Sequence, residues 1–456
     1  MEGSEANSWS KYYQDLATPA DDETFDNNFL YHVQLTHLLT ALNTSGQTLP
    51  LITDNEVQKH LERLRNGKAA DIYGITAEHM KWASSKIVNI LGHLINLIVR
   101  TARLPDELKI GSISPVHKKN KPYKLPTYYR RITITALISK VVSCHILLHT
   151  DAILNTAQSR LQFGFTSDLA PIFAAVLMTE IIAQAIDNNE QLLITFMDTS
   201  KAFDVVHHDC LLNAMQLQGV EGTLWKLYDS MYTGGRSVVK WKDEFSDAIE
   251  EKQGIKQGEK TATSCYKAGK NRLLNRLDIS PSLHIGSISA GALMVADDLA
   301  IASRNPHDMQ AALYTAEMDA SRERYKFNTD KTKTLAINYK QQPTLILNKK
   351  PLTISSKEVH LGIHRTSDGK IKATIGDRIN SARSACYAMR DAGLHGAGPE
   401  IAMAQYAHYV LPTLLYGFEA LVIKGECLEE LEKYHLRTST TSNTYHSQLL
   451  WPSTYY

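Results

Sequence analysis

Apolar residues in the middle of the chain form short runs of strand length. Residues 293–302 read L-M-V-A-D-D-L-A-I-A, which is two such runs joined at Asp297 and Asp298. Because the runs lack a helix-length period, they predict a buried β-hairpin with the two aspartates at its tip. Aspartate is also common in ordinary turns, so the hairpin alone is compatible with a simple turn as well as with a functional site.

A second apolar run, Q-L-L-I-T-F-M at residues 191–197, is nearly continuous and ends at Asp198. It predicts another buried strand. A charged residue at the end of a buried strand is well placed to reach a cleft, since the strand gives it a rigid base. We therefore expect Asp198 to converge with the aspartates of the hairpin.

The sequence predicts helices before and after these strands. Residues 81–103 predict an amphipathic helix with Ile90, Leu91 and Ile98 in its apolar stripe. Other elements are predicted as strands at 110–117 and 237–241, small hairpins within 344–363, and helices near 55–65, 133–150, 168–186, 221–232, 261–277 and 305–324. From residue 372 the pattern is mainly helical, so a separate helical domain is expected to begin near Gly369.

Length and composition indicate a soluble globular protein with a substantial core. A chain of 456 residues predicts two or three subdomains, and 43% hydrophobic with 21% charged residues provides enough apolar surface to bury. No apolar stretch is judged long and uncharged enough to span a membrane, so no membrane association is expected. The acidic, polar N-terminus is unlike a secretory signal. We expect an intracellular protein, with nucleus and cytoplasm both open.

Charge is unevenly distributed along the chain. The net charge is only +1, which disfavours a protein that coats nucleic acid, but basic residues outnumber acidic ones between Val57 and Arg160. Within this region, H-K-K-N-K-P-Y-K is followed closely by Y-Y-R-R. Basic residues interleaved with tyrosines are typical of phosphate binding, and also of a solvated loop, so both remain open. The five cysteines are scattered, which favours reduced thiols over disulfides or zinc.

Three aspartates at the ends of two buried strands suit divalent-metal chemistry. Carboxylate oxygens are hard ligands for Mg²⁺, which keeps positions open for substrate phosphates. Two such ions about 3.5–4 Å apart stabilise both the attacking and the leaving oxygen of a phosphoryl transfer. The chain has no G-x-x-x-x-G-K phosphate loop, which disfavours an ATPase.

Several motifs together resemble the reverse transcriptase domain of non-LTR (LINE-type) retrotransposons. The central ones are F-M-D-T-S-K-A-F-D-V-V-H-H-D at 196–209, G-I-K-Q-G at 254–258 and V-A-D-D at 295–298. The flanking motifs follow the order of that family: N-G-K-A-A-D-I-Y-G-I, P-V-H-K-K, Y-Y-R-R-I, Q-F-G-F, N-T-D-K-T-K and H-L-G-I. The resemblance extends from about Thr53 to Val422, which is most of the chain.

The resemblance implies an α+β fold of the right-hand polymerase type. Its palm would be an antiparallel sheet with helices on one face, combined with fingers and a helical thumb. The implied boundaries are a loosely structured lead-in at 1–52, fingers with an N-terminal extension at 53–190, palm with interleaved fingers elements at 191–365, thumb at 366–440 and a frayed tail at 441–456. The implied activity is RNA-directed DNA synthesis from an RNA template, a DNA primer and dNTPs, and the oligomeric state stays open.

The resemblance also assigns roles to individual residues. Asp198 and Asp297 would bind two Mg²⁺ ions, with Mn²⁺ as an alternative, and Asp298 would support them. Lys331, with Lys333 as the alternative, would lie near the leaving pyrophosphate as its proton donor. The substrate-binding and primer-binding positions are Phe203 under the nucleotide sugar, Gln257 and Gly258 at the nucleotide pocket, Lys118 or Lys119 and Arg130 at the triphosphate, and Leu361 and Gly362 in the primer grip.

Two departures from the family pattern keep alternatives open. After Gln257 the chain reads G-E-K-T-A-T-S-C-Y where the family has a Ser-Pro-Leu-rich segment, and T-S-D-L-A-P follows Phe165 where the family has an Arg-rich one. Such changes fit a catalytically impaired relic that only binds nucleic acid. A metal-dependent phosphohydrolase with an aspartate triad is the second alternative, although it would not predict the basic region or Phe203.

Overall fold

The computed structural model describes residues 5–43, 46, 48–118, 121–278, 283–389, 391 and 398–443. The chain divides into two compact units. Unit 1 comprises Met1–Phe165, Asp198–Ile279 and Ala312–Asn328, and unit 2 comprises Thr166–Met197, Ser280–Ala311 and Thr329–Tyr456. Each unit combines helices with sheets, as expected for an α+β protein. Residues 191–365 contribute to both units, so this expected segment is divided between them.

The sheet of unit 1 has the order β2-β1-β4-β5, with β6 paired to β4. Strand β1 is antiparallel to β2 and parallel to β4. The bounds are β1 Ile110–His117, β2 Tyr129–Thr135, β4 Arg236–Trp241, β5 Glu244–Phe245 and β6 Ile249–Glu250. The predicted strand at 110–117 is therefore confirmed, and the one at 237–241 corresponds to β4.

Strand β2 corrects the helix that was predicted from residue 133. Arg131, Thr133 and Thr135 are buried in alternation, which is the period of a strand. The helix begins only at Leu137, whose backbone N–H donates to the Asp71 carboxylate at 2.8 Å. The apolar run in the sequence continues from the strand into the helix. The cap that separates the two elements comes from a residue far away along the chain, so local periodicity does not reveal it.

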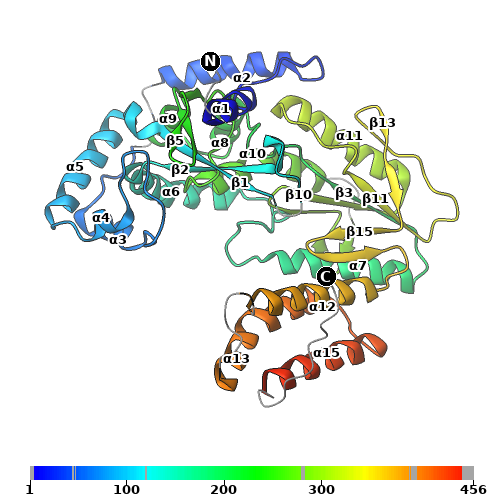
Figure 1. Cartoon of the computed structure of the whole chain (residues 1–456). Coiled ribbons are helices and arrows are strands. Elements are labelled where there is room, and N and C mark those ends of the chain that lie inside the picture. Colours follow the sequence, from blue (N-terminus) through cyan, green and yellow to red (C-terminus); the bar gives the residue numbers. More distant parts are fainter. Residues whose placement is uncertain are drawn as a thin grey trace. The chain divides into compact units, whose positions relative to one another are not determined.

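Many helices of unit 1 pack around a large hydrophobic core. Their bounds are α1 Glu5–Ala17, α2 Asn27–Leu42, α3 Asp54–Glu62, α4 Ala77–Lys81, α5 Lys86–Thr101, η1 Asp106–Lys109, η2 Pro126–Tyr128, α6 Leu137–Ala157, α8 His208–Leu217, α9 Gly222–Tyr232 and α10 Ala262–Asp278. Helix α3 packs against α4, α5 and α6 (Figure 1). In α5, Leu91 and Ile98 are buried as predicted, but Ile90 is 60% exposed and was wrongly placed in the apolar stripe.

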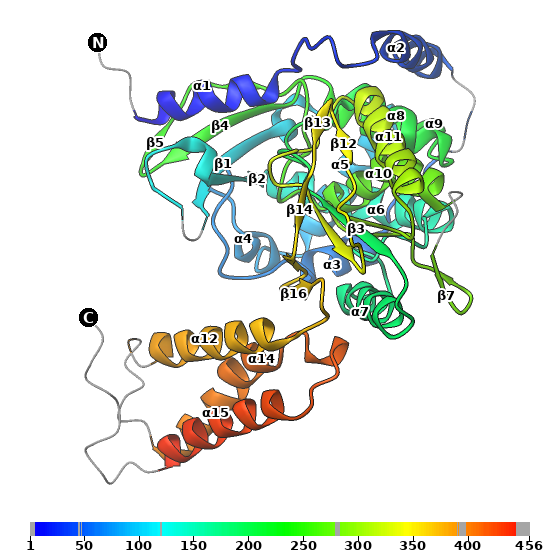
Figure 2. The same cartoon turned by 90° about the vertical axis from the view of Figure 1, so that its right-hand side faces the viewer.

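The described residues among the first 52 include two helices, which differs from the loosely structured lead-in that was expected. Helix α1 lies along the sheet and contacts β4 and β6 (Figure 2). Tyr13 and Ala17 of α1 are buried against Ile113, Val239 and Ile249 of the sheet. Helix α2 packs on α8. The polar composition of this stretch concealed two helices that each bury only a narrow face.

Helix α6 is, within the described part of the chain, the one helix long and apolar enough to cross a membrane by length and composition. The expectation that no stretch has these properties is therefore wrong. Half of this stretch is buried inside the protein. Its polar residues have internal partners: a ring nitrogen of His145 lies 3.0 Å from the Pro50 carbonyl, and the Thr150 hydroxyl donates to the Ile146 carbonyl. Such burial is typical of a core helix.

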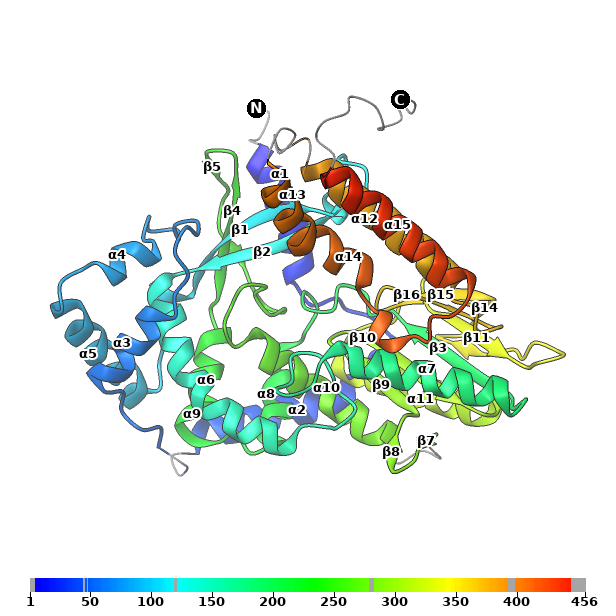
Figure 3. The same ribbon diagram turned by 90° about the horizontal axis from the view of Figure 1, so that it is seen from below.

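The main sheet of unit 2 has the order β14-β11-β3-β10-β9. Helix α7, Pro171–Asp187, contacts β9 and β11 of this sheet (Figure 3). Three small hairpins, β7-β8, β12-β13 and β15-β16, accompany it. The bounds are β3 Leu192–Met197, β7 His284–Ile285, β8 Ile288–Ser289, β9 Ala292–Val295, β10 Asp298–Ser303, β11 Lys333–Ile337, β12 Ile346–Leu347, β13 Lys350–Pro351, β14 Thr353–Ser355, β15 Lys357–His360 and β16 Ile363–Thr366.

The C-terminal part of unit 2 is helical, as the sequence predicted. Its elements are α12 Lys372–Met389, α13 Pro399–Gln405, η4 Tyr406–Val410, α14 Leu411–Leu415, η5 Phe418–Ala420 and α15 Glu426–Asn443. Helix α12 packs against α14 and α15 around Ile375, Val410 and Leu414 (Figure 2). Helix α11, Pro306–Glu323, begins in unit 2 and continues in unit 1. Residues 444–456, which include most of the tail expected to fray, lie outside the described residues.

Candidate active site

The sheet of unit 2 brings two strand ends to one edge. Strands β3 and β10 are antiparallel, with Met197 opposite Leu299. The end of β3 therefore lies beside the start of β10. Asp198 follows Met197 in the chain, and Asp298 precedes Leu299 as the first residue of β10. The predicted buried strand that ends at Asp198 is thus confirmed, and it is the neighbour of the aspartate hairpin.

The predicted hairpin is also confirmed, with one correction at its tip. Val295 pairs with Asp298, so the connecting turn consists of Ala296 and Asp297 alone. Asp297 is half-buried and Asp298 is exposed. Ala296 has a φ of 60°, a left-handed conformation that costs an alanine about 1–2 kcal/mol. Strained backbone of this kind concentrates at functional sites, and here it adjoins Asp297.

Strand β11 adds a lysine near the same edge of the sheet. It is antiparallel to β3, with Lys333 opposite Phe196 and Ile337 opposite Leu192. The start of β11 therefore lies beside the end of β3. Lys331 is exposed in the turn that precedes β11. Lys331 thus precedes a strand that neighbours β3, and its expected role near the pyrophosphate stays a prediction.

The loop of residues 254–258 is fixed within unit 1 by its own backbone. The Gln257 carbonyl accepts a hydrogen bond from the Thr133 N–H at 2.8 Å. Gly258 has a φ of 127°, and a Cβ atom there would lie 2.3 Å from the Thr133 carbonyl oxygen. Only glycine fits this position. The loop is therefore pressed against strand β2.

The same loop holds Phe203. The Ile255 N–H donates to the Phe203 carbonyl at 2.8 Å. The Phe203 ring stacks on Tyr266 of α10, with ring centroids 4.5 Å apart and an angle of 15° between the planes. Phe203 is half-buried, whereas Tyr266 is 1% exposed. Unit 1 thus holds Phe203 against the loop that contains Gln257. The roles of both residues at the nucleotide stay a prediction.

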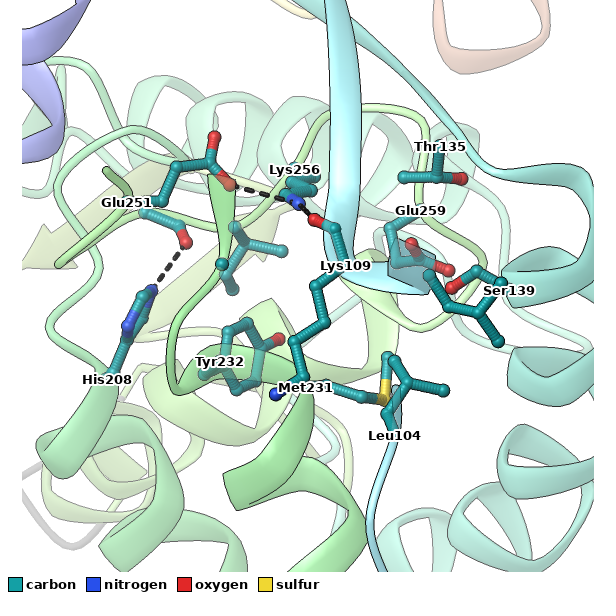
Figure 4. Close-up of a pocket in the computed structure, with 14 residues that line it drawn as sticks. Leu104, Lys109, Thr135, Ser139, His208, Met231, Tyr232, Glu251, Lys256 and Glu259 are labelled. Carbon is teal, nitrogen blue, oxygen red and sulfur yellow. Dashed lines mark hydrogen bonds and ion pairs between the residues drawn. The ribbon is translucent and has the colours of Figure 1, made fainter. Parts of the chain in front are cut away.

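A buried ionic cluster supports this loop, and sequence reasoning missed it. Glu251 forms an ion pair with Arg131. It also pairs with Lys256 at 3.1 Å (Figure 4). The side chains of Arg131 and Glu251 are each 5% exposed. Burial lowers the pKa of Lys256 to about 8 and also lowers the pKa of Arg131. The Lys256 ammonium also donates to the Lys109 carbonyl, so it ties the loop to the start of β1.

A small cavity lies beside Lys256. Its volume is about 30 Å³, which is room for about one water molecule and far below the size of a nucleotide pocket. The His208 ring, which lines it, donates to the Gly254 carbonyl at 2.9 Å (Figure 4). Burial lowers the pKa of His208 to about 4, so the ring is neutral near pH 7. We therefore assign the cavity to the packing around the loop.

The basic residues near β1 and β2 have separate positions. Lys118 is half-buried, and its ammonium donates to the Thr127 carbonyl at 2.9 Å. Arg130 is exposed on β2, whereas its neighbour Arg131 turns inward to Glu251. Successive residues of a strand face opposite sides, so the basic pair in the sequence divides into one surface and one buried arginine. Lys119 lies outside the described residues.

The Leu361-Gly362 turn joins β15 to β16, and other residues of unit 2 contact it. Both residues have positive φ, 52° and 75°, as a tight two-residue hairpin turn requires. Arg378 of α12 donates to the Gly362 carbonyl at 2.9 Å. Its guanidinium lies over the Tyr416 ring, whose hydroxyl donates to the Leu361 carbonyl at 3.4 Å. This turn is therefore a rigid feature.

The donor set suits Mg²⁺ that is bound together with a substrate. Among the described residues, no group of three or more His, Cys, Asp or Glu side chains forms a ready-made metal site. Mg²⁺ differs from structural metals, because it keeps several waters and is usually held by one or two carboxylates plus substrate phosphates. Aspartates at the ends of neighbouring strands fit that requirement without a closed cage.

Comparison with known proteins identifies similar sequences over this region. Residues 116–363 match the family model described as reverse transcriptase (RNA-dependent DNA polymerase). A probable RNA-directed DNA polymerase from transposon BS of Drosophila melanogaster is 25% identical over 240 residues, which is 50% of this chain and 25% of that protein. A probable RNA-directed DNA polymerase from transposon X-element of the same organism is 28% identical over 205 residues, or 44% of this chain and 22% of that protein.

A longer match is found in the retrovirus-related Pol polyprotein from the type-2 retrotransposable element R2DM of Drosophila melanogaster. The identity is 21% over 339 residues, covering 72% of this chain and 31% of that protein. The chain thus spans 22% to 31% of the length of these three relatives.

Proposed function

We propose that the chain, which belongs to the reverse transcriptase (RNA-dependent DNA polymerase) family, copies RNA into DNA as the polymerase unit of a non-LTR retrotransposon protein. The observation that carries this proposal is the register of β3 and β10, with Met197 opposite Leu299. In a chain of this family, that register supports a shared role for Asp198 and the aspartates of the hairpin.

The three aspartates would bind the divalent cations. Asp198 and Asp297 would hold two Mg²⁺ ions, for which Mn²⁺ is a chemical substitute, and Asp298 would support them. When bound, the ions would stabilise the charge on the attacking and leaving oxygens. Lys331 would give a proton to the leaving pyrophosphate. Its exposure next to the start of β11 leaves it accessible to a substrate.

The loop and ring of unit 1 would bind the incoming nucleotide. Phe203 would lie under the sugar and exclude a ribose 2′-hydroxyl, and its stack on Tyr266 would make that steric limit rigid. Gln257 and Gly258 would line the pocket. Arg130 would hold the triphosphate with Lys118 or Lys119, because a planar guanidinium suits phosphate oxygens.

The fold would work as a right-hand polymerase on an RNA template and a DNA primer. We propose fingers at 53–190, palm at 191–365 and thumb at 366–440, with Leu361 and Gly362 as the primer grip. The turn that contains these two residues is rigid, which supports a role in fixing the primer end. The helices after residue 371 form their own core, as a thumb would.

The fold around the departure after Gln257 favours an active polymerase over a relic. Although the Ser-Pro-Leu-rich segment is missing, the helix that follows the loop is present as α10. The loop itself keeps its backbone contacts with β2 and with Phe203. We therefore expect the substitutions after Gln257 to alter substrate affinity more than they alter the geometry of the pocket.

Primer extension on an RNA template with Mg²⁺ and dNTPs tests the proposal. The wild-type chain should extend the primer, and Asp297→Asn should abolish extension while the protein remains folded. Asp368→Asn is a matched control, because Asp368 is an exposed aspartate paired with Lys370.

Two other results would favour the alternatives. Binding of template and primer without extension by well-folded wild-type protein would support a relic. Release of phosphate from nucleotides in the absence of primer would support a phosphohydrolase.

A further inference from the structure

The backbone of Asp198 is paired with a segment that follows helix α11. The Asn328 N–H donates to the Asp198 carbonyl at 2.8 Å, and the Ser200 N–H donates to the Lys326 carbonyl at 2.9 Å. Between these bonds, Thr199 forms an antiparallel bridge with Phe327. Residues 198–200 and 326–328 thus form a short ladder within unit 1. The direction in which the chain leaves β3 at Asp198 therefore depends on the position of residues 326–328.

Arg324 controls how the chain enters that segment. Helix α11 ends at Glu323, and Arg324 has a φ of 60°, which turns the chain sharply. A non-glycine residue keeps such a conformation only when its surroundings fix it. The Arg324 side chain is buried, with 7% exposure. Its contacts are therefore the candidates for what fixes the turn.

The hydrogen bonds and the ring contact of the Arg324 side chain come from residues 20–27, which we name the N-terminal strap. The Arg324 guanidinium donates to the Asn27 side-chain oxygen at 2.9 Å and to the Ala20 carbonyl at 3.2 Å. It also lies over the Phe25 ring, 4.9 Å from its centroid. Hydrogen bonds from a charged donor are stronger than those between neutral groups. Arg324 is thus the main anchor of the strap.

Further contacts extend the strap along both sides of Arg324. On the helix side, the Asp26 N–H donates to the Ser321 carbonyl at 3.1 Å, and the Ser321 hydroxyl donates to the Thr24 carbonyl at 2.7 Å. On the other side, Asp22 pairs with Lys326, which holds the pKa of Asp22 well below its usual value. The Lys326 side chain is 48% exposed, so this ion pair contributes less than the buried arginine.

We propose that the N-terminal strap is a positioning element of the polymerase site. It fixes the Arg324 turn, and through residues 326–328 it sets the backbone of Asp198. The strap lies outside residues 116–363, which match the family model. The catalytic part of this proposal rests on the proposed role of Asp198 in metal binding, whereas the coupling of the strap to Asp198 can be measured without activity.

Hydrogen–deuterium exchange tests the coupling directly. Arg324→Gln and Phe25→Ala both weaken the strap, and neither residue belongs to the proposed catalytic or binding machinery. We expect the amides of Ser200 and Asn328 to exchange about tenfold faster in each variant, because local opening becomes easier while the rest of the fold is retained. Arg160→Gln is the matched control in the same unit, since Arg160 is 70% exposed and forms a surface ion pair with Asp278.

The same variants test the consequence for catalysis. Arg324→Gln should raise the Mg²⁺ concentration for half-maximal primer extension severalfold, with little change in the affinity for template and primer. A general loss of stability would lower the active fraction without shifting the Mg²⁺ dependence. Arg324→Lys, which keeps the charge near Phe25, should restore part of the wild-type Mg²⁺ dependence.

Each result has a distinct meaning. Unchanged exchange at Ser200 and Asn328 in folded Arg324→Gln and Phe25→Ala would overturn the proposal. Faster exchange with an unchanged Mg²⁺ dependence would overturn its catalytic part. If exchange responds but the wild-type chain extends no primer under any condition, the proposed function fails and the catalytic part fails with it, while the coupling between strap and Asp198 stands.

Discussion

The edge of the β3-β10 sheet and the loop of residues 254–258 are held in place by different forces. Strand β3 is apolar, and Leu192, Leu193 and Ile194 are at most 1% exposed. The loop depends on the buried charges of Arg131, Glu251 and Lys256 and on close backbone contact. Apolar burial tolerates changes at the solvent-facing strand ends, whereas a buried ion pair fails when one partner is removed. Substitutions at the sheet edge should therefore change activity with little change in stability, whereas substitutions at the loop should change both.

The largest expected effect is on activity at the sheet edge. Asp198→Asn should reduce primer extension by at least about 100-fold, because a neutral amide stabilises metal-bound charge poorly. The free energy of unfolding should change by no more than about 1 kcal/mol, since the half-buried Asp198 lies beyond the buried apolar residues of β3. Primer extension and denaturant unfolding measured on the same preparation check both statements. A large loss of stability would contradict the separation of chemistry from folding.

The largest expected effect on stability is at Glu251. Glu251→Gln removes the carboxylate that pairs with both buried cations, Arg131 and Lys256, and should lower the free energy of unfolding by about 3 kcal/mol. Glu250→Gln is the matched control, because Glu250 is adjacent in sequence but 60% exposed in its ion pair with Lys252. The control should change stability by less than about 1 kcal/mol. Equal effects of the two substitutions would mean that the buried cluster does not support the loop.

A smaller effect is expected from a single methyl group in the loop. Gly258→Ala places a Cβ atom against the Thr133 carbonyl at a φ that alanine disfavours, and should cost about 2 kcal/mol. It should also raise the KM for dNTP, because Gln257 is displaced with the backbone. Gly234→Ala is the control: Gly234 has a φ of 71°, but its Cβ position is open. Steady-state kinetics and thermal unfolding of the pair separate the steric contact from backbone strain alone.

The smallest expected effect is a pH dependence of the free energy of unfolding, and it involves neither the sheet edge nor the loop. His37 on α2 lies between Asp209 and Asp229, at 3.0 and 3.1 Å, and these carboxylates raise its pKa to about 9. Because the pKa of His37 is raised in the folded chain, its protonation stabilises the fold fully at pH values below the unfolded pKa of about 6.5. This stabilisation is lost as the pH rises through about 9.

The corresponding measurement is the free energy of unfolding at pH 6 and at pH 9.5. The wild-type chain should lose about 1–2 kcal/mol relative to His37→Gln over this interval. The variant retains all other titrating groups, so it is the control for their contribution. A wild-type chain whose stability relative to the variant is the same at both pH values would contradict the assignment of His37.

The elements that local periodicity defines were predicted well. Strand β1 has the predicted bounds, and the hairpin around Asp297 and the strand before Asp198 are present. These elements depend on side chains close together in sequence. Strand β2 was missed because the cap that starts α6 comes from Asp71, far from Leu137 along the chain.

The supports of the site were not predictable in the same way. Arg131 and Arg130 are identical in type, and only the strand alternation of β2 makes one buried and the other exposed. The N-terminal strap is polar and aperiodic, so its contacts with Arg324 arise entirely from the tertiary fold. Motifs indicated which residues would carry the chemistry, but the long-range contacts that hold them required the structure.

The most direct test of the aspartate site is a crystal structure of the chain with RNA template, DNA primer, an incoming nucleotide and Mn²⁺. Anomalous scattering locates Mn²⁺ independently of the protein coordinates. We expect two anomalous peaks in contact with the carboxylates of Asp198 and Asp297, and the loss of at least one peak in Asp297→Asn. Carboxylates of Asp198 and Asp297 that lie too far apart to share the ions, with no anomalous peak at either, would contradict the proposed site.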